Sequence, residues 1–332
     1  MSPGRLDVIG ARAPRIVGAL ENAGIYLLVA LLVIAGALTS PGFLAPEKLL
    51  GTVQNVSLLG IVAAGVAFVT FSGHFADLSV PAVMALSGIV CVSSLRWGLL
   101  PAAALGLASG VAVGAVNGLV IGRLRANPII WTLVTAAAGS GLIRWAFSNT
   151  QAYPSGDSAA GKAFLALFGG GIAGIPLTVL VLAAMIAGGQ FLLARTKFGA
   201  QVKLMGSSYE VARMTGVDTR KIALEVFMLS SFAASVGGIL LASLNKLGAE
   251  YIGKGYDFTA VTAVVLGGVT LAGGRGNMLG VLGGVLAIGL MENVLTLNGV
   301  SVDWQEVVKG SLFILVVGTA AYLARRQGQD DA

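Results

Sequence analysis

The sequence predicts an all-α protein that crosses a membrane many times. Of its residues, 56% are hydrophobic and only 11% are charged, whereas soluble domains carry about a quarter charged residues. Apolar stretches recur along the chain at roughly the 20-residue length that a membrane-spanning helix needs. The chain also contains 48 glycines, and small residues let helices approach closely in lipid. These observations predict a polytopic membrane protein with about ten transmembrane helices.

The predicted spans follow one another with short connections. The first apolar run is long and is not followed by an Ala-x-Ala cleavage site, so we interpret it as a retained helix rather than a signal peptide. The shortest run, 257–271, leaves open whether it crosses the whole membrane. The predicted spans are 24–40, 50–72, 78–95, 98–121, 128–148, 172–194, 221–244, 257–271, 277–298 and 304–324.

Basic residues gather in every second connection, as the positive-inside rule expects of cytoplasmic segments. The remaining connections hold only Lys48, Arg96, Lys162, Lys246 and Lys254. Both termini are therefore predicted to be cytoplasmic. The formal net charge of +6 then reflects membrane topology, and we expect no nucleic-acid partner.

This topology divides the chain into three expected parts. They are a cytoplasmic N-terminal segment 1–22, a transmembrane domain 23–324 and a cytoplasmic tail 325–332. Within the transmembrane domain, the polar stretch 148–164 is predicted to be an outer loop, because small polar and turn-forming residues dominate it.

The longest charged connection, 195–221, is predicted to contain a short cytoplasmic helix. Its SSYEVARM sequence has serine followed by Glu210 in the first turn, which is a helix-start pattern, and Gly216 would end the helix. Such a helix suits docking of another protein or contact with lipid headgroups. Glu210 and Asp218 favour the protein partner, because acidic groups weaken contact with anionic lipid.

Enzymatic chemistry is not expected of this chain. Gly-Gly-Arg-Gly at 273–276 lacks the Gly-Lys-Ser/Thr ending of a phosphate-binding loop. The single histidine, His74, has no metal-ligand cluster around it in the sequence, and Cys91 is the single cysteine. We predict no catalytic residues and no metal, so energy from ATP must come through a partner.

Two glycine-broken apolar segments, 65–73 and 267–276, echo each other in the two halves of the chain. Paired interruptions of this kind are typical of transporter sites. The first leads into Asp77, Ser79 and Pro81, which resemble a helix start with an N-cap acceptor and an early proline. Asp77 is therefore expected to cap this helix, with contact to the transported solute as the alternative.

Polar residues within predicted spans are costly and mark candidate functional sites. Glu292 must be paired, protonated or exposed to a wet path, so we weigh a sugar-contacting carboxylate against a buried pair with lysine or arginine. Asn117 is expected to bond a neighbouring helix or to line the path. Arg144 is interpreted as an interface anchor, and Lys309 as a partner for Glu306 or an outer anchor.

The chain resembles the permease subunits of bacterial ABC sugar importers of the ribose type. HFADLSVPAVMALSG is similar to the family's Gly-Ile-Asp-Leu-Ser-Val-Gly and Ala-Leu-Ser-Gly motifs. The segments GAVNGLVIGRLRANPIIWTLVT, GKGYDFTAVTAVVLGGVTLAGGRGNMLGVLGG and GVSVDWQEVVKGSLFILVV also follow the family pattern. The chain departs from it at His74-Phe75-Ala76, where Gly-Gly-Ile is usual, and at Glu292, where many relatives have asparagine.

The resemblance implies a permease in the bacterial inner membrane, working by alternating access. It implies three partners: a separate ABC ATPase that binds ATP, an extracytoplasmic solute-binding protein and a second permease copy in a homodimer or heterodimer. Membrane lipid surrounds the chain. The expected ATPase-coupling residues in 195–221 are Tyr209, Glu210, Ala212, Arg213 and Gly216.

The sequence thus predicts an importer of a monosaccharide or similar polyol. An ion-coupled secondary transporter, with Glu292 or Asp77 as its coupling acid, and a purely structural membrane subunit are the alternatives. The expected substrate-path candidates are His74, Asp77, Asn117, Glu292 and Asn293.

Overall fold

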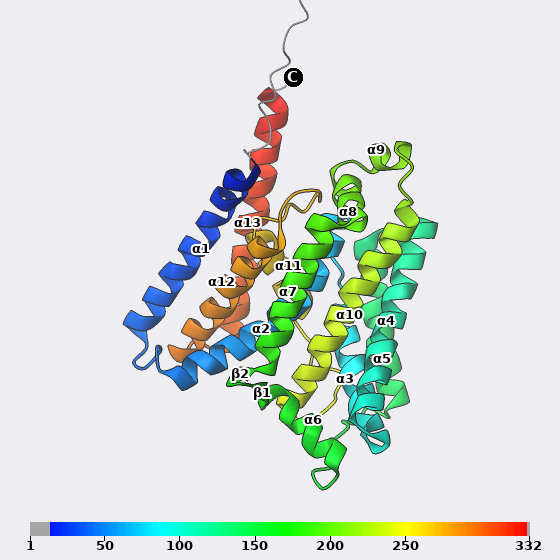
Figure 1. Ribbon diagram of the computed structural model, residues 1–332, viewed down its shortest axis with the longest axis vertical. Coiled ribbons are helices and arrows are strands. Elements are labelled where there is room, and N and C mark those ends of the chain that lie inside the picture. The colour runs from blue at the N-terminus through cyan, green and yellow to red at the C-terminus, as the bar shows by residue number, and fades with distance from the viewer. Residues whose placement is uncertain (1–13, 331–332) are drawn as a thin grey trace, which may run out of the picture.

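The protein is a bundle of helices with one small β-hairpin (Figure 1). The computed structural model describes residues 14–330, and the side chains of 23–319. Residues 1–13 of the predicted segment 1–22 lie outside the described residues, as do 331–332 of the predicted tail 325–332. The all-α fold class is confirmed.

The elements follow in the order of their labels. The first half holds α1 (Pro14–Thr39), α2 (Pro46–Phe71), α3 (Val80–Ser94), a 3₁₀ turn (Leu95–Trp97), α4 (Leu99–Leu124), α5 (Pro128–Ala146) and α6 (Ala159–Gly169). A hairpin of β1 (Gly171–Ile172) and β2 (Ile175–Pro176) leads into α7 (Leu177–Arg195), α8 (Lys197–Ser207) and α9 (Tyr209–Met214). The last part holds α10 (Thr219–Asn245), α11 (Tyr256–Leu266), α12 (Met278–Leu297) and α13 (Val302–Asp330).

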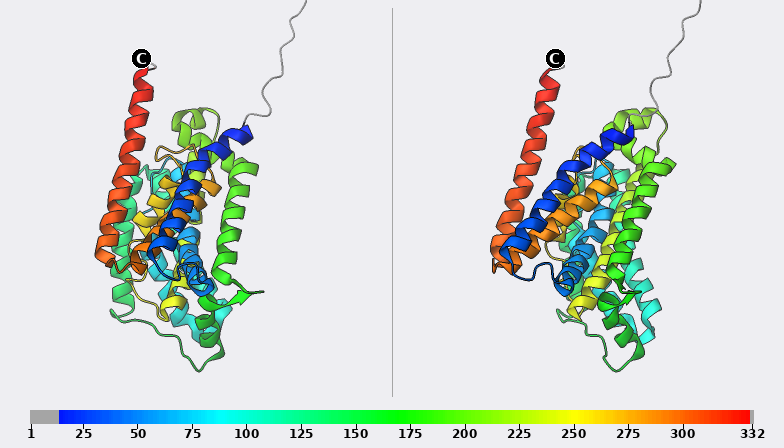
Figure 2. Two further views of the ribbon diagram at one scale, coloured as in Figure 1. Left: turned by 90° about the vertical axis from the view of Figure 1, so that its left-hand side faces the viewer. Right: turned by 60° about the vertical axis from the view of Figure 1, so that its left-hand side comes forward.

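The two ends of the bundle differ in what they carry. In Figure 1 the start of α1, the end of α13 and the α8–α9 pair lie at one end, and α6 with the hairpin lies at the other. Figure 2 shows the same division from two further sides, with α13 standing at one edge of the bundle. We call the two ends the α9 end and the α6 end.

Helix α2 forms the centre of the bundle. Almost all of its residues from Val56 to Phe71 are buried, and it contacts α7, α10, α11 and α12. α10 is buried over most of its length as well. α5, in contrast, has few buried residues and lies at the outside.

Seven of the predicted spans reappear as helices long and apolar enough to cross a membrane, counted over the described residues. Their ends agree with the predicted ranges to within a few residues, because apolar length is a local property of the sequence. Of the other three predicted spans, 24–40 and 304–324 correspond to α1 and α13, which are not among the seven, and 257–271 is the shortest. Its helix α11 has 11 residues, about 16 Å at 1.5 Å per residue, and is too short for a hydrocarbon core of about 30 Å.

Three structured parts were not predicted. Helix α6 begins at Ala159, inside the stretch 148–164 that was expected to be a loop, with Ser158 as its N-cap. The β-hairpin occupies the start of the predicted span 172–194. Helix α8 precedes the expected helix within 195–221, and the hydroxyl of Thr196 accepts the N–H of Gly199 at its start.

A row of glycines lets α4 lie directly against its neighbours. Gly106, Gly110, Gly114 and Gly118 recur every four residues along one face of α4. A methyl group added at Gly114 would lie 2.5 Å from the carbonyl oxygen of Phe227, and one at Gly118 would lie 2.5 Å from the Cα of Leu224. The backbones of α4 and α10 are therefore in contact. We call these four residues the α4 glycine row.

Replacing Gly114 by alanine should destabilise the protein by about 1–3 kcal/mol, the usual cost of overpacking a close contact. The added methyl group has backbone on its far side, which cannot rotate away. Thermal unfolding in detergent and the level in the membrane would measure the loss. Gly141→Ala in α5 is the matched control, because nothing lies within 4 Å of a methyl group there. Equal stability of the two variants would contradict direct contact of the backbones.

Candidate functional site

A polar cavity lies towards the α6 end of the bundle. Its volume is about 310 Å³, which is at the lower end of the range for small-molecule sites. Helices α2, α11, α12 and α13 form most of its walls, and Leu244 of α10 also lines it. Its polar lining residues are Thr52, Asn55, Lys254, Tyr256, Thr259, Glu292, Asn293, Thr296, Gln305 and Lys309. We call it the polar cavity.

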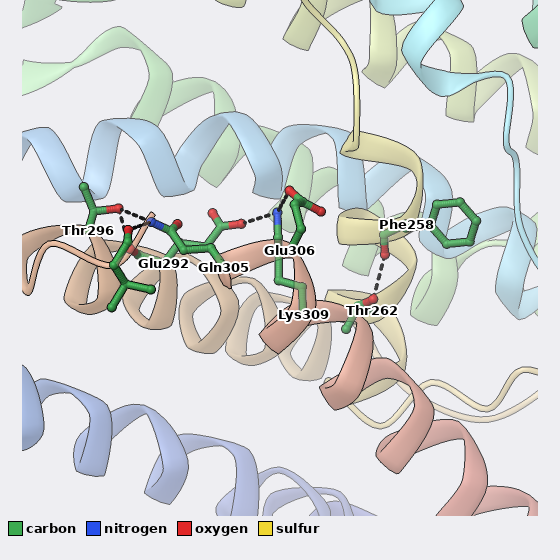
Figure 3. A network of polar contacts seen from close by, with 8 residues as sticks. Phe258, Thr262, Glu292, Thr296, Gln305, Glu306 and Lys309 are labelled. Carbon is green, nitrogen blue, oxygen red and sulfur yellow. Dashed lines mark hydrogen bonds and ion pairs between the residues drawn. The ribbon is translucent and has the colours of Figure 1, made fainter. Parts of the chain in front are cut away.

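Lys309 holds the charged part of this wall together (Figure 3). Its Nζ lies 3.0 Å from Oε1 of Glu292 on α12 and 2.6 Å from Oε1 of Glu306 on its own helix, α13. The Lys309 side chain is 14% exposed and that of Glu292 is 33% exposed. The predicted pair of Glu292 with a lysine is therefore present, and so is the Glu306–Lys309 pair.

The pairing of Glu292 does not remove it from the cavity. Glu292 is accessible and lines the cavity, so one carboxylate oxygen contacts Lys309 while the group as a whole faces the open space. Because Lys309 has two carboxylate neighbours, its charge is balanced even when one of them is engaged elsewhere. The two readings of Glu292, a buried pair and a path-lining carboxylate, are thus compatible.

Hydroxyl and amide groups lie beside this triad (Figure 3). Nε2 of Gln305 donates to Oγ1 of Thr296 over 3.0 Å and to the carbonyl oxygen of Val300 over 3.0 Å. Next to Glu292, the buried Oδ1 of Asn293 has no hydrogen-bond partner among the residues that the structure describes. A buried acceptor without a partner is costly, so a ligand hydroxyl or a water molecule at this point would be stabilised.

Local packing explains why these side chains meet. Asn277 accepts the N–H of Gly280 and starts α12. Gly289 lets α12 lie close against Val56 of α2, and the next turn of α12 carries Glu292 and Asn293. Phe313 on α13 meets Phe258 on α11 edge to face, with ring centroids 6.4 Å apart. This contact holds α13 where Lys309 reaches Glu292.

Several cavity residues were not predicted as site residues. Lys309 was considered only as a partner of Glu306 or an anchor, while Asn55, Tyr256 and Gln305 were not considered. Gln305 lies four residues before Lys309, so both project from one face of α13. That spacing was the available signal, but the sequence does not reveal that this face meets Glu292.

Asp77 lies away from the polar cavity, in a closed network. It is fully buried, and its Oδ1 accepts the N–H of Ser79 at 3.1 Å and the hydroxyl of Ser79 at 2.6 Å. Its Oδ2 accepts the hydroxyl of Ser230 on α10 at 2.8 Å. The expected cap interaction is present, because Asp77 accepts the N–H of Ser79 at the start of α3. The helix itself begins at Val80, and Ser79 in the N-cap position makes no side-chain cap bond.

Asn117 belongs to the same network. Its Nδ2 donates to Oγ of Ser79 over 2.9 Å, and its Oδ1 accepts the indole N–H of Trp131 and the hydroxyl of Thr135 on α5. Asn117 is also fully buried. Its amide therefore joins α4 to α3 and α5, which agrees with the expected bond to a neighbouring helix.

His74 lies in the break between α2 and α3. Its Nδ1 is 2.8 Å from Oγ of Ser72, and its ring meets Phe227 of α10 edge to face. Phe75 beside it has a φ of 69°, a conformation that costs a bulky residue about 1–2 kcal/mol. Of the five predicted path residues, Glu292 and Asn293 line the polar cavity, whereas His74, Asp77 and Asn117 do not.

The expected helix at the α9 end is present as α9. Ser208 is its N-cap and accepts the N–H of Val211, and Gly216, with a φ of 82°, follows its end. The predicted residues Tyr209, Glu210, Arg213 and Gly216 are exposed, and Ala212 is fully buried. Ala212 therefore anchors α9 to the bundle and does not face a partner.

Because Asp77 accepts three hydrogen bonds, Asp77→Ala should destabilise the protein by about 1–3 kcal/mol, the cost of leaving buried donors unsatisfied. Asp77→Asn should stay close to the original stability, since its amide oxygen keeps both Ser79 donors and its nitrogen faces the rotatable Ser230 hydroxyl. Thermal unfolding in detergent distinguishes them. The exposed Asp157→Ala is the control. A stable but transport-dead Asp77→Asn would show that the carboxylate itself takes part in transport.

Comparison with known proteins identifies the family. The sequence profile of the family described as "branched-chain amino acid transport system / permease component" matches residues 49–317. The ribose import permease protein RbsC of Bacillus subtilis is 33% identical over 306 residues, covering 90% of this chain and 92% of its own. The L-arabinose transport system permease protein AraH of Escherichia coli is 35% identical, covering 90% of this chain and 89% of its own. The chain therefore belongs to this family, as a multi-pass inner-membrane permease subunit of an ABC importer and not as an enzyme.

Proposed function

We propose that this chain imports a monosaccharide or similar polyol and that the polar cavity is part of its path. The observation that carries the proposal is the lining of the cavity by carboxylate, amide, hydroxyl and ammonium groups at one end of the bundle. Sugar hydroxyls both donate and accept hydrogen bonds, so a mixed lining of this kind suits them. The ribose and arabinose permeases among the relatives support the same substrate class.

The charges of the cavity also favour a neutral solute. Lys309 lies between two carboxylates, so its charge is already balanced and does not call for an anionic ligand. Glu292 is left with accessible surface and can accept hydroxyl hydrogen bonds, and charge-assisted bonds are about twice as strong as neutral ones. The unpaired Oδ1 of Asn293 supplies a second acceptor one residue away.

Membership of the family implies that ATP is used by a partner ATPase and that a solute-binding protein delivers the cargo. In this proposal the ATPase docks on α9, at the cytoplasmic side, and the solute-binding protein docks at the α6 end. A second permease copy completes the path, and both termini are cytoplasmic. The exposed Val211 and Met214 beside Glu210 and Arg213 support a protein partner at α9.

Glu292→Gln tests the cavity. The amide keeps the shape of the side chain but accepts weaker hydrogen bonds, so the KM for sugar uptake should rise several-fold, matching a loss of about 1 kcal/mol. Lys309 keeps Glu306 as its partner, so the protein should still fold. Uptake of labelled ribose and arabinose is measured in proteoliposomes with the partner proteins. Glu225→Gln, in an exposed pair with Lys221, is the control.

Unchanged uptake by Glu292→Gln would remove the polar cavity from the path. Uptake of leucine in place of either sugar would favour the amino acid class named in the family description. Uptake that continues without the ATPase and stops when the proton gradient is collapsed would favour the ion-coupled alternative.

Glu210→Lys tests the docking of the ATPase on α9. Reversing an exposed charge at a docking helix should lower co-purification of the ATPase about tenfold, within the usual range of effects for interface charges. Asp157→Lys makes the same change of charge in an exposed loop at the α6 end and should leave co-purification unchanged. Normal co-purification and transport by Glu210→Lys would contradict docking on α9.

A further inference from the structure

Three segments far apart in the sequence meet backbone to backbone beside the last turn of α8. Phe71 ends α2, Gly206 lies in the last turn of α8, and Gly274 lies in the loop between α11 and α12. The N–H of Gly274 donates to the carbonyl oxygen of Phe71 over 2.9 Å. Because the last carbonyl groups of a helix have no partner within it, this bond ties the end of α2 to the α11–α12 loop.

No side chain separates these segments. A methyl group added at Gly206 would collide with the carbonyl oxygen of Phe71 and the nitrogen of Gly274. A methyl group at Gly273 would lie 2.8 Å from the Cα of Gly206 and 2.7 Å from the nitrogen of Gly73. Real Cβ atoms essentially never approach so closely. We call Gly73, Gly206, Gly273 and Gly274 the glycine junction.

The glycine junction unites the two glycine-broken segments that the sequence singled out, 65–73 and 267–276. These segments were expected to indicate the transporter site. They meet each other, but they lie away from the polar cavity. Leu59, the last cavity residue along α2, comes twelve residues before Phe71, which is about 18 Å along the helix at 1.5 Å per residue. The junction therefore needs a role other than solute contact.

Three of the helices that wall the polar cavity lead to the glycine junction. α2 ends there, and α11 and α12 are joined by the loop that carries Gly273 and Gly274 (Figure 1). On its other side the junction contacts α8, which is followed directly by α9. The hydroxyl of Thr219 on α10 donates to that of Tyr209 on α9 over 3.2 Å, and the buried Ala212 also holds α9 against the bundle.

We propose that the glycine junction is the mechanical link that carries movement of α8 and α9 to the walls of the polar cavity. The proposal rests on the proposed function, in which the partner ATPase docks on α9. A side chain at a contact can absorb a displacement by changing its rotamer, whereas touching backbones have no such freedom. A displacement of α8 is therefore passed directly to the end of α2 and to the α11–α12 loop.

Gly206→Ala tests the link, in the complex reconstituted with the ATPase and the solute-binding protein. The added methyl group forces α8 away from Phe71 and Gly274. Sugar uptake per ATP hydrolysed should fall about tenfold, within the usual range of coupling between sites, while co-purification with the ATPase stays normal because α9 is unchanged. Gly188→Ala is the matched control: Gly188 is also helical, and nothing lies within 4 Å of a methyl group there.

A second measurement keeps this test separate from the identity of the cargo. Spin labels at Met214→Cys on α9 and Leu297→Cys at the far end of α12 report the distance between the docking helix and the cavity wall. The proposal expects ATP to change this distance in the otherwise unmodified chain, and expects the change to be lost with Gly206→Ala. If ATP changes the distance between the labels in the unmodified chain but the chain takes up no sugar, the proposed cargo is wrong, whereas the mechanical link through the glycine junction is supported.

Two results would overturn the proposal: a normal uptake-to-ATP ratio in Gly206→Ala, or a distance change that this variant retains. Should Gly206→Ala fail to reach the membrane, a second pair of spin labels replaces it, at Met214→Cys on α9 and Leu279→Cys in the first turn of α12, which are both exposed and leave the junction glycines unchanged. If the junction moves as one unit, ATP should leave this distance unchanged. A change on addition of ATP would show that the segments separate and would contradict the link.

Discussion

Contact between helix backbones is the interaction on which this bundle depends. In a membrane, burying an apolar side chain between two helices gains little, because the lipid tails that it leaves are equally apolar. Close packing then supplies much of the attraction, through many small dispersion contacts. Glycine makes such packing possible along the α4 glycine row and at the glycine junction. The positions of α2, α4, α8 and α10, and with them the polar cavity, follow from these contacts.

Polar groups in the bundle fall into two kinds, and the difference separates structure from transport. Around Asp77 and Asn117 the carboxylate and amide groups are fully buried and bonded to neighbours at the start of α3 and on α5 and α10. A closed network of this kind fixes helices relative to one another. Around Glu292 and Asn293 one side chain is accessible and the other has an unpaired buried oxygen. Of these two groups, the second has hydrogen-bonding capacity left for a passing solute.

The sequence was informative where structure is set locally. Seven spans, the start and end of α9, and the pairing of Glu292 with a basic residue could all be predicted from apolar length, capping residues and the cost of a charge in lipid. The sequence was not informative where a contact depends on how segments far apart in the chain pack against each other. That Lys309 reaches Glu292 depends on how α13 packs against α11 and α12, and the burial of Asp77 depends on Ser230, 153 residues away. Helix α6 was missed because the polar residues before Ser158 dominated its stretch.

The four-residue spacing of the α4 glycine row also fixes the register of α4 against α10. A shift of one residue turns the helix by 100° and would bring Val113 or Ala115 against the backbone of α10. Steric clashes therefore exclude registers of α4 between those that place a glycine at the contact. Packed surfaces of this kind have discrete arrangements and do not slide gradually. α13 differs, since nothing lies within 4 Å of methyl groups built at its Gly310 and Gly318. It meets α12 and α11 through the side chains of Gln305, Lys309 and Phe313. During alternating access α4 and α10 can therefore turn only as a single body, whereas α13 has the freedom to tilt on its own.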